Sequence, residues 1–303
     1  MLVFGAVFVD VKGFPSGKYI PTGRNIGRVE FVHGGVCRNV AENFARLGVP
    51  VQFVSMVENS AMGVEVRERL NNLGVDTTHL LSEENGMGMW LAILDENGDL
   101  AGSISRQPEF RPLEEYVAAH ADDILACGDD VIIEFDMNAE IAASVLAAAR
   151  RHGNKVYSIV GNMGVILKHP EYLREVRCFI CNENEAGRLF SMDLSAHTPD
   201  EMLPVLIEKS KAAGISSMVI TMGAQGSVFV DHENDCSGFC PANSVEMVDS
   251  TGAGDAFFTG AVAALSRGLE LPKAVFVGTQ LAALTLQVAE SCCPCATHLL
   301  KDS

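Results

Sequence analysis

Basic residues are scarce in this chain of 303 residues, in which 22 Lys and Arg stand against 39 Asp and Glu. The formal net charge of −17 disfavours nucleic acid and anionic membrane surfaces as general partners, because like charges repel. We therefore expect neither as a partner. An anionic small molecule would need a local binding feature to overcome this charge.

An apolar run long enough to cross a membrane is also missing. The apolar start MLVFGAVFVDV is too short for a span and lacks the basic leader of a signal peptide. We expect it to be a buried first strand, and the protein to be cytosolic. With 48% hydrophobic residues the chain can bury one large core, and it contains no internal repeat or low-complexity linker.

Cysteines are present, but almost none has the spacing of a metal site. Their odd number, nine, without a secretion signal argues against a disulfide framework. Cys178 and Cys181 have C-x-x-C spacing, but strand alternation in VRCFICN sends the two side chains to opposite faces, so zinc is not expected. Cys292, Cys293 and Cys295 have no His or Cys pair at the regular spacing of metal ligands. We expect them to lie in a loop, where their thiols could be reactive.

Two common nucleotide-binding sequences are absent as well. No GxxxxGK[ST] occurs, which excludes an ordinary P-loop, and Gly5-Ala6-Val7 does not complete a dinucleotide fingerprint. A different glycine turn, Thr221-x-Gly223-x-x-Gly226, lies between the apolar runs SMVIT and SVFV. Such a turn can lie along the phosphates of a nucleotide.

Predicted strands alternate with predicted helices along most of the chain. The strands are LVFGAVFVDV, VQFVSMV, VIIEF, KVYSIV, CFICN, SMVITM and SVFV, and the helices include NVAENFARLG, AEIAASVLAAARRHG and MLPVLIEKSKAAG. Each of these helices ends in Gly, as a C-terminal cap would. The alternation predicts an α/β fold with a doubly wound, mostly parallel sheet covered by helices on both faces. Ligands of such sheets bind beyond the carboxyl ends of the strands.

Two segments depart from this alternation. Residues 87–104 predict a β-hairpin with a two-residue turn at Asn97-Gly98, and residues 11–32 are rich in Gly, Pro and β-formers. Together they are expected to form a small β-sheet lid, which can close over a substrate and whose apolar face suits a homodimer. The main domain would then comprise residues 1–10, 33–86 and 105–303. An edge extension of the main sheet is the alternative.

The stretch DSTGAGDAFFTGAV, residues 249–262, places two glycines and two aspartates ahead of an apolar helical run. One interpretation is structural: one of residues 249–251 caps the helix, and the small residues allow close packing. The other is chemical, because the unpaired amides of residues 252–254 can hold an anion at the positive end of the helix. Asp255 would then be a reactant, kept ionised by a depressed pKa and ready to accept a hydroxyl proton.

A second glycine pair opens the amphipathic segment HGGVCRNVAENFARLG, residues 33–48. A sugar could lie against Gly34 and Gly35, with the Asn39 amide offering hydrogen bonds to its hydroxyls. A tight turn with a capping Asn explains the same residues. Asp10 ends the first predicted strand, where its carboxylate could hold two sugar hydroxyls or simply form a turn.

The sequence NENE follows the predicted strand CFIC and begins a helix. Asn182 and Glu185 share a face at i and i+3, and oxygen ligands on one face suit Mg²⁺ bound through its water shell. A capping box, in which each side chain satisfies the other's backbone amide, is the structural alternative.

Taken in order, these motifs resemble those of the ribokinase-like (PfkB) family of sugar and nucleoside kinases over essentially the whole chain. GGVCRNVAENFARLG resembles the family's first signature, NENE its Asn-x-x-Glu magnesium motif, and DSTGAGDAFFTGA its second signature. The resemblance implies transfer of the γ-phosphate of ATP, with Mg²⁺, to a primary hydroxyl of a small sugar or nucleoside.

The resemblance also implies a role for each motif residue. Asp255 would be the general base, and the amides of Gly252, Ala253 and Gly254 would form the anion hole. Asn182 and Glu185 would organise the Mg²⁺ of MgATP. The remaining implied contacts are Thr221, Gly223 and Gly226 for the nucleotide, Asp10, Gly34, Gly35 and Asn39 for the acceptor, and Asp249 and Ser250 for a monovalent cation such as K⁺.

The acceptor is predicted from a smaller set of residues. The run RNVAEN, residues 38–43, looks most like the pseudouridine kinase branch of the family, which favours a nucleoside. The Asp-Ser-Asn-Pro-Gly run of that branch is matched here by residues 23–27, where only Asn25 and Gly27 correspond. Arg24 could meet an anionic acceptor or lie on the surface. The alternatives are a free sugar or sugar acid (ribose, fructose or 2-keto-3-deoxygluconate) and a non-catalytic sugar-binding module.

Overall fold

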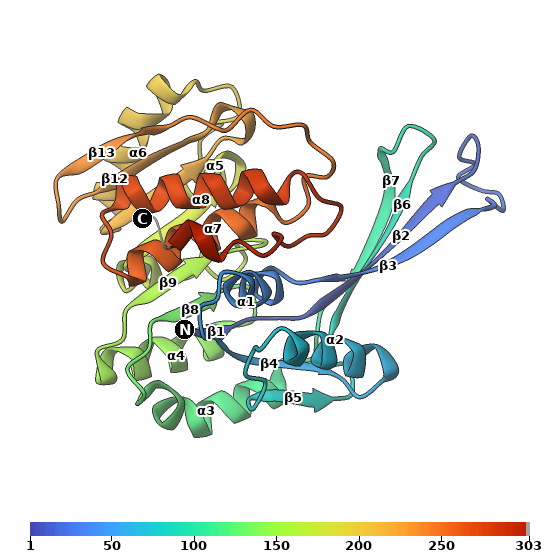
Figure 1. The fold of residues 1–303 in the computed structure, drawn as a ribbon, viewed down its shortest axis with the longest axis horizontal. Helices are drawn as coiled ribbons and strands as arrows, with labels where there is room; N and C mark the ends of the chain where they lie inside the picture. The colour runs from blue at the N-terminus through green and yellow to red at the C-terminus, as the bar shows by residue number, and fades with distance from the viewer. Residues whose placement is uncertain (301–303) are drawn as a thin grey trace.

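The computed structural model describes residues 1–300, and a nine-stranded sheet forms its centre (Figure 1). The strand order is β13-β12-β11-β10-β9-β8-β1-β4-β5. From β11 to β5 all neighbours are parallel, and β12 and β13 add antiparallel pairs at one edge. The bounds are β1 (Leu2–Phe4), β4 (Gln52–Glu58), β5 (Leu80–Glu83), β8 (Val131–Glu134), β9 (Val156–Ile159), β10 (Cys178–Asn182), β11 (Ser217–Thr221), β12 (Ser227–Asp231) and β13 (Cys236–Cys240).

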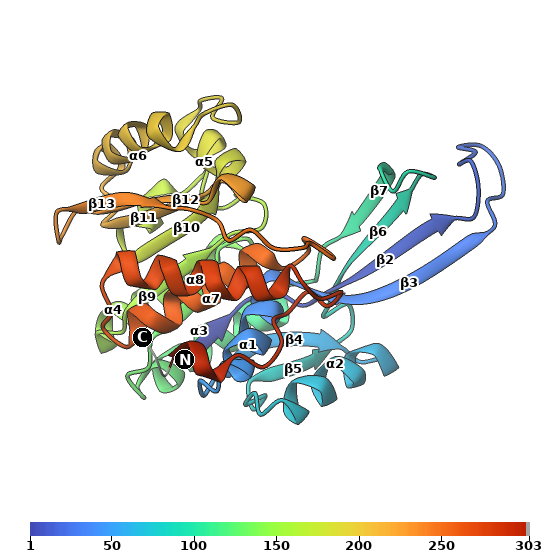
Figure 2. The same cartoon turned by 45° about the horizontal axis from the view of Figure 1, so that its top comes forward.

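Helices cover both faces of this sheet, which confirms the predicted doubly wound architecture (Figures 1 and 2). The helices on one face are α1 (Val36–Arg46), α2 (Ala61–Asn72), α7 (Ala253–Ser266) and α8 (Leu271–Thr285). Those on the other face are α3 (Arg111–Leu125), α4 (Ala139–His152), α5 (Glu183–Phe190) and α6 (Pro199–Ala213). As predicted, α4 and α6 end at left-handed glycines, Gly153 and Gly214, both with φ of 75°. No helix between residues 1 and 300 has the length and apolar character needed to cross a membrane.

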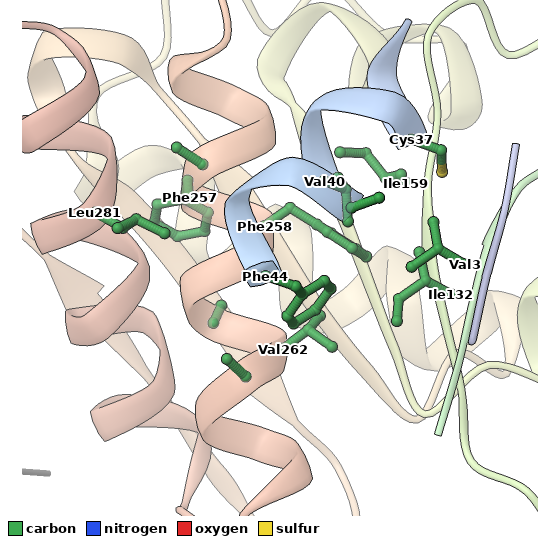
Figure 3. Close-up of a cluster of buried hydrophobic side chains, with 14 of the residues drawn as sticks. Val3, Cys37, Val40, Phe44, Ile132, Ile159, Phe257, Phe258, Val262 and Leu281 are labelled. Atoms are coloured by element: carbon green, nitrogen blue, oxygen red, sulfur yellow. The ribbon is translucent and has the colours of Figure 1, made fainter. Parts of the chain in front are cut away.

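The hydrophobic core beneath α1 and α7 supports the N-terminal ends of these two helices, where the candidate site lies. Figure 3 shows Val40 and Phe44 of α1 beside Phe258 and Val262 of α7, all buried, with Val3 of β1 nearby. Burying each such side chain contributes about 1.5–3 kcal/mol. This packing fixes the start of α1 against the start of α7.

Strand alternation places the C-x-x-C pair as expected. Cys178 belongs to the hydrophobic cluster under α1, α7 and α8, whereas Cys181 belongs to the cluster on the opposite face. Neither can share a ligand with the other. In residues 1–300 no group of three or more His, Cys, Asp or Glu side chains is placed to hold a metal ion, and all nine cysteines are free thiols.

The first predicted strand is in fact two strands in two different sheets. β1 ends at Phe4, and a second strand, β2 (Phe8–Pro15), begins after three residues. Between them the Ala6 amide donates to the buried carboxylate of Glu134 at 3.1 Å, so it leaves the ladder of the main sheet. Asp10 therefore lies inside β2, and the prediction that it ends the first strand is wrong.

The second sheet has four strands in the order β3-β2-β6-β7 and extends away from the main body (Figures 1 and 2). The other strands are β3 (Gly27–Gly34), β6 (Gly88–Leu94) and β7 (Leu100–Arg106). It is a separate sheet and not an edge extension of the first. Its strands include half of residues 11–32 and most of residues 87–104, but β2 already begins at Phe8.

The β6–β7 turn also differs from the prediction. Asp95 and Asp99 pair through a 2.8 Å hydrogen bond, so the loop contains three residues, Glu96 to Gly98. Gly98 alone adopts a left-handed conformation, with φ of 87°, as in a type I turn followed by a bulge. The Asp95 carboxylate accepts hydrogen bonds from the Asn97 and Asp99 amides, and this side-chain contact favours the longer loop.

Candidate active site

The start of α7 is built around a glycine that no other residue can replace. Gly252 is the N-cap with φ of 79°, and a Cβ there would come within 1.9 Å of the carbonyl oxygen of Ser291. Within residues 1–300 no side chain caps this helix, so the capping interpretation of residues 249–251 is wrong. The Asp249 carboxylate instead accepts a hydrogen bond from the Thr251 amide at 2.8 Å.

The amides of this first turn are mostly unpaired. Among residues 1–300, Gly252 and Gly254 have no acceptor for their backbone N–H groups, whereas the Ala253 amide donates to the Ser250 carbonyl at 3.3 Å. The Ala253 amide is therefore not available to an anion, although it was predicted to form the anion hole with Gly252 and Gly254. Two free amides at the positive end of a buried helix can still hold an anion.

Asp255 lies in the first turn of α7, and the residue is partly buried. Desolvation raises its pKa to about 7, the hydrogen bond from Asn39 and the charge of Arg38 lower it, and the charge of Glu185 raises it. The predicted depressed pKa is therefore wrong. A carboxylate with a pKa near neutrality is a better general base than a strongly acidic one, because it holds the abstracted proton more tightly.

Asn39 of α1 positions this carboxylate. Its Nδ2 donates to Asp255 Oδ2 at 2.6 Å, and its Oδ1 accepts from Ser291 Oγ at 3.2 Å and from Cys292 Sγ at 3.6 Å. Both ends of the amide are thus used within the protein. The Oδ1 atom is therefore not free to accept from a sugar hydroxyl, whereas the second N–H of Nδ2 has no partner among residues 1–300, so the predicted contact with the acceptor stays a prediction for that N–H alone.

The double glycine and Asp10 do come together. Gly35 precedes α1 with φ of 98°, and a Cβ there would lie 2.6 Å from the Ala6 carbonyl oxygen. A Cβ on Gly34 would lie 3.0 Å from Asp10 Oδ2, so the Asp10 carboxylate rests against the Gly34 backbone. Burial raises the pKa of Asp10, while the charges of Lys12 and Arg38 oppose that rise.

Arg38 is a member of the site that sequence reasoning missed. Its side chain is only 1% exposed, and its guanidinium donates to Glu42 Oε2 at 2.7 Å, to the Gly34 carbonyl at 3.2 Å, to Ser291 Oγ at 3.4 Å and to the His33 carbonyl. The i,i+4 spacing of Arg38 and Glu42 was the available signal. Arg24, by contrast, is exposed.

Glu42 gathers three arginines beneath the site. Burial alone would raise its pKa, but the hydrogen bond from Arg69 and the charges of Arg38, Arg69 and Arg46 lower it to about 2. Arg46 and Arg69 also bind Glu290, at 2.8 and 2.9 Å. The network ties α1 and α2 to the loop that carries Ser291 and Cys292.

The cysteines of that loop are mostly hidden. Residues 289–296 contain no helix or strand, as predicted. Cys292 and Cys293 are buried, and burial raises the pKa of each thiol to about 12, which disfavours the reactive thiolate. Of the three cysteines in this loop, Cys295 alone is exposed.

Asn182 and Glu185 form the capping box that was the structural alternative. The Glu185 amide donates to Asn182 Oδ1 at 2.9 Å, and the Asn182 amide donates to Glu185 Oε2 at 2.8 Å. Burial raises the pKa of Glu185, and the nearby Asp136 carboxylate adds to the rise. One oxygen of each side chain is thus used to start α5.

Two further carboxylates lie at the end of β8, Glu134 as its last residue and Asp136 two residues beyond it, and sequence reasoning missed both. Glu134 is buried, and burial together with the charge of Asp136 raises its pKa to about 8. Asp136 accepts hydrogen bonds from the Gly161 and Asn162 amides, but its buried Oδ1 has no partner among residues 1–300. The sequence signal was an Asp directly after a buried strand, at the edge where such sheets bind ligands.

A cavity of about 610 Å³ joins the glycine turn to the start of α7. Thr221, Gly223 and Gly226 line it together with Ala253 and Gly254. Its other walls are mainly small or apolar, among them Ala242, Val245, Met247, Phe257, Ala282, Ala283 and Leu286. This volume and lining suit a purine ring and ribose whose phosphates extend toward the helix N-terminus.

A carboxylate with a raised pKa beside free helix amides, at the end of a nucleotide-sized cavity in a doubly wound sheet, defines a small-molecule kinase. The family described as pfkB family carbohydrate kinase matches residues 1–297, and the chain belongs to this family. The predicted family and enzyme class are thereby confirmed.

Relatives with known names include both nucleoside and sugar kinases. A guanosine-inosine kinase of Exiguobacterium acetylicum is 35% identical, over 95% of each chain. A pseudouridine kinase of Escherichia coli (strain K12) is 24% identical, over 91% of this chain and 86% of its own length. The fold matches the structure of Arabidopsis thaliana ribokinase complexed with ribose and ATP, with a TM-score of 0.80, 20% identity, and coverage of 99% of this chain and 97% of the other.

Proposed function

We propose that this kinase transfers the γ-phosphate of ATP to a primary hydroxyl of a ribonucleoside. The observation that carries the proposal is the Asp255 carboxylate, held by Asn39 beside the free amides of Gly252 and Gly254. The names of the guanosine-inosine and pseudouridine kinase relatives support a nucleoside acceptor. Because the guanosine-inosine kinase shares more of this sequence, a 6-oxopurine nucleoside ranks ahead of pseudouridine as the candidate acceptor.

In this mechanism Asp255 accepts the proton of the acceptor hydroxyl as the hydroxyl oxygen attacks the γ-phosphorus in line. The bond between the γ-phosphorus and the bridging oxygen breaks, and ADP is the leaving group. The amides of Gly252 and Gly254, with the positive end of α7, stabilise the negative charge on the transferred group. Asp10 and the Gly34 backbone hold the ribose hydroxyls. Thr221, Gly223 and the rest of the cavity hold the nucleotide.

The carboxylates at the ends of β8 and β10 fit a magnesium ion bound with the nucleotide. Mg²⁺ keeps several waters and uses one or two carboxylates together with phosphates. Asp136, with its unpartnered Oδ1, and Glu185 are the two groups that would hold it. Bound Mg²⁺ would neutralise charge on the β- and γ-phosphates.

A monovalent cation beside α7 is a further part of the proposal. The hydrogen bonds from residues 250 and 251 and the Lys12 charge outweigh burial and lower the pKa of Asp249, so this carboxylate is ionised. With Ser250 it could hold K⁺ near the anion hole. Rates should be higher in K⁺ than in a bulky organic cation, and equal rates would remove K⁺ from the account.

The acceptor is tested by a phosphorylation screen with MgATP. The panel contains guanosine, inosine, pseudouridine, uridine, adenosine, ribose, fructose and 2-keto-3-deoxygluconate, and ADP release is measured for each. We expect the highest kcat/KM with a ribonucleoside. A kcat/KM for ribose, fructose or the sugar acid that exceeds every nucleoside would contradict the nucleoside assignment, and no turnover with any compound would contradict the kinase mechanism.

A further inference from the structure

The four-stranded sheet has two faces of different character. Asp10 lies opposite Trp90 of β6 in the parallel ladder, and Trp90 lies opposite Ser105 of β7. Opposite residues share a face, and so do residues two apart along a strand. One face, here called the cleft face, therefore carries Phe8, Asp10, Lys12, Trp90 and Ser105. The other carries Val29, Phe31, Leu91 and Ile104, all exposed.

The cleft face is turned toward the catalytic centre. The Asp10 carboxylate rests against Gly34, immediately before α1. Asn39, in the first turn of the same helix α1, donates to Asp255 of α7 at 2.6 Å, so the segment beside Asp10 adjoins the start of α7. A ligand on the cleft face is therefore near the start of α7.

Two aromatic side chains flank Asp10 on this face. The Phe8 ring lies directly over Gly88, since a Cβ at Gly88 would come within 2.3 Å of the ring. Trp90 follows two residues along β6, about 6.6 Å from Gly88. Neither ring is fully buried, so both keep accessible aromatic surface. Trp90 is the only tryptophan in the chain.

The spacing of these groups matches a nucleoside. Asp10 and Trp90 stand on adjacent strands, about 4.8 Å apart. In a nucleoside the base is bonded directly to the ribose, so a sugar held by Asp10 places its base within reach of a neighbouring strand. Of the two residues opposite Asp10, Val32 of β3 and Trp90 of β6, only Trp90 offers an aromatic ring. A free pentose would reach Asp10 and leave the Trp90 surface uncovered.

We propose that Trp90 stacks on the nucleobase of the acceptor while Asp10 binds its ribose, so that Trp90 determines the preference for nucleosides over free sugars. This inference rests on the proposed nucleoside kinase function. Base stacking on an aromatic ring tolerates different bases, because every base has a π-face. Trp90 therefore selects the class of acceptor, and other contacts select the base.

Kinetics of two variants test the assignment. Trp90→Leu should raise KM about 10- to 100-fold for the nucleoside that the screen ranks first, the range expected for loss of one base stack, with kcat changed less than about threefold. Trp90→Phe should recover most of the affinity. KM for D-ribose should stay unchanged in both. Phe239→Leu, the same kind of aromatic-to-aliphatic change at an exposed residue of β13 outside the small sheet, is the matched control and should behave as wild type.

Fluorescence supplies a readout that does not require turnover. With excitation at 295 nm and no ATP, the ranked nucleoside should quench the emission of the single tryptophan saturably, and D-ribose should not. The assignment is overturned if Trp90→Leu keeps the wild-type KM for the nucleoside, or if the KM values for nucleoside and ribose rise by the same factor. It is also overturned if saturating nucleoside leaves the tryptophan emission unchanged. If no nucleoside is phosphorylated by the wild type, the proposed function fails and Trp90 loses its role with it.

Discussion

At the scale of single residues, the account depends on the environment of Asp255. Sequence reasoning identified this residue as the base through its motif, but predicted a depressed pKa because it considered only the helix N-terminus. Burial has the larger effect and raises the pKa to about 7. Burial depends on α1 packing over α7, and no local pattern in residues 249–262 contains that information.

The raised pKa predicts the pH dependence of catalysis. The base must be ionised, so kcat/KM should be constant above about pH 8 and fall tenfold per pH unit well below pH 7. Asn39→Leu removes a hydrogen bond that lowers the Asp255 pKa, and should move the midpoint to higher pH. Steady-state rates at constant ionic strength give the profile, with melting curves to verify folding. A rate that stays flat down to pH 5 contradicts this assignment of the base.

Other residues were invisible because their partners are far away in sequence. Asn39 was expected to bind a sugar, but Ser291 and Cys292 occupy its Oδ1 from a loop about 250 residues later. Asn182 and Glu185 show the opposite case. Their capping box is local, three residues apart, and it was predictable as an alternative.

At the scale of elements, the join between α1, α2 and the loop at 289–296 holds the site in place. Glu42 is fully buried and accepts hydrogen bonds from Arg38, Arg46 and Arg69. An unpaired buried charge is costly. A neutral side chain in place of Glu42 would therefore leave the positive charges of the three arginines without their counter-charge. Because Arg38 also contacts Ser291, disturbance of Glu42 should reach the Asn39–Asp255 pair.

Glu42→Gln should therefore lower the free energy of unfolding at pH 7 by about 3 kcal/mol, since three buried or half-buried arginines lose their counter-charge. The folded pKa of about 2 lies below the ordinary 4.5, so this stabilisation is complete above pH 4.5 and is lost as the pH falls toward 2. Urea titrations at pH 7 and in acid measure it.

Glu115→Gln, which breaks an exposed i,i+4 pair with Arg111, is the control and should barely change stability. Equal stabilities of Glu42→Gln and wild type at pH 7 would show that the network contributes nothing.

Element boundaries were less predictable than element types. The alternation of strand and helix was predicted correctly, because apolar spacing is a local property. The division of MLVFGAVFVDV into β1 and β2 was missed, since it follows from the Ala6 amide binding Glu134, 128 residues away. The three-residue turn at Glu96 was missed because the Asp95 side chain competes with the Asn97-Gly98 preference.

At the scale of the whole molecule, the proposed site draws on both sheets. The main sheet and its helices carry the nucleotide-sized cavity and the start of α7, and Asp10 and Trp90, the proposed acceptor contacts, lie on the smaller sheet, which extends from the main body in Figure 1. The alternation of predicted strands and helices predicted the main sheet. The two segments that depart from this alternation predicted the smaller sheet. The outward apolar face of the small sheet, with Phe31 at 61% and Ile104 at 71% exposure, is not used by the proposed site.

We propose that this face forms a homodimer. Light scattering after size exclusion should give twice the chain mass of 32.4 kDa, and Phe31→Glu should give the monomer, because a charge replaces an apolar contact. Phe239→Glu, at an exposed phenylalanine of β13, should leave the dimer intact. A wild-type mass of 32.4 kDa at micromolar concentration contradicts this interface.

The most direct test of the central claim is the turnover of Asp255→Asn. The amide keeps the size of the side chain but cannot accept the hydroxyl proton as a base. With saturating MgATP and the ranked nucleoside, the account predicts that kcat falls by about 10³-fold or more, with the KM for ATP and the melting temperature close to wild type. Near wild-type turnover by the folded variant would contradict the claim that Asp255 is the base.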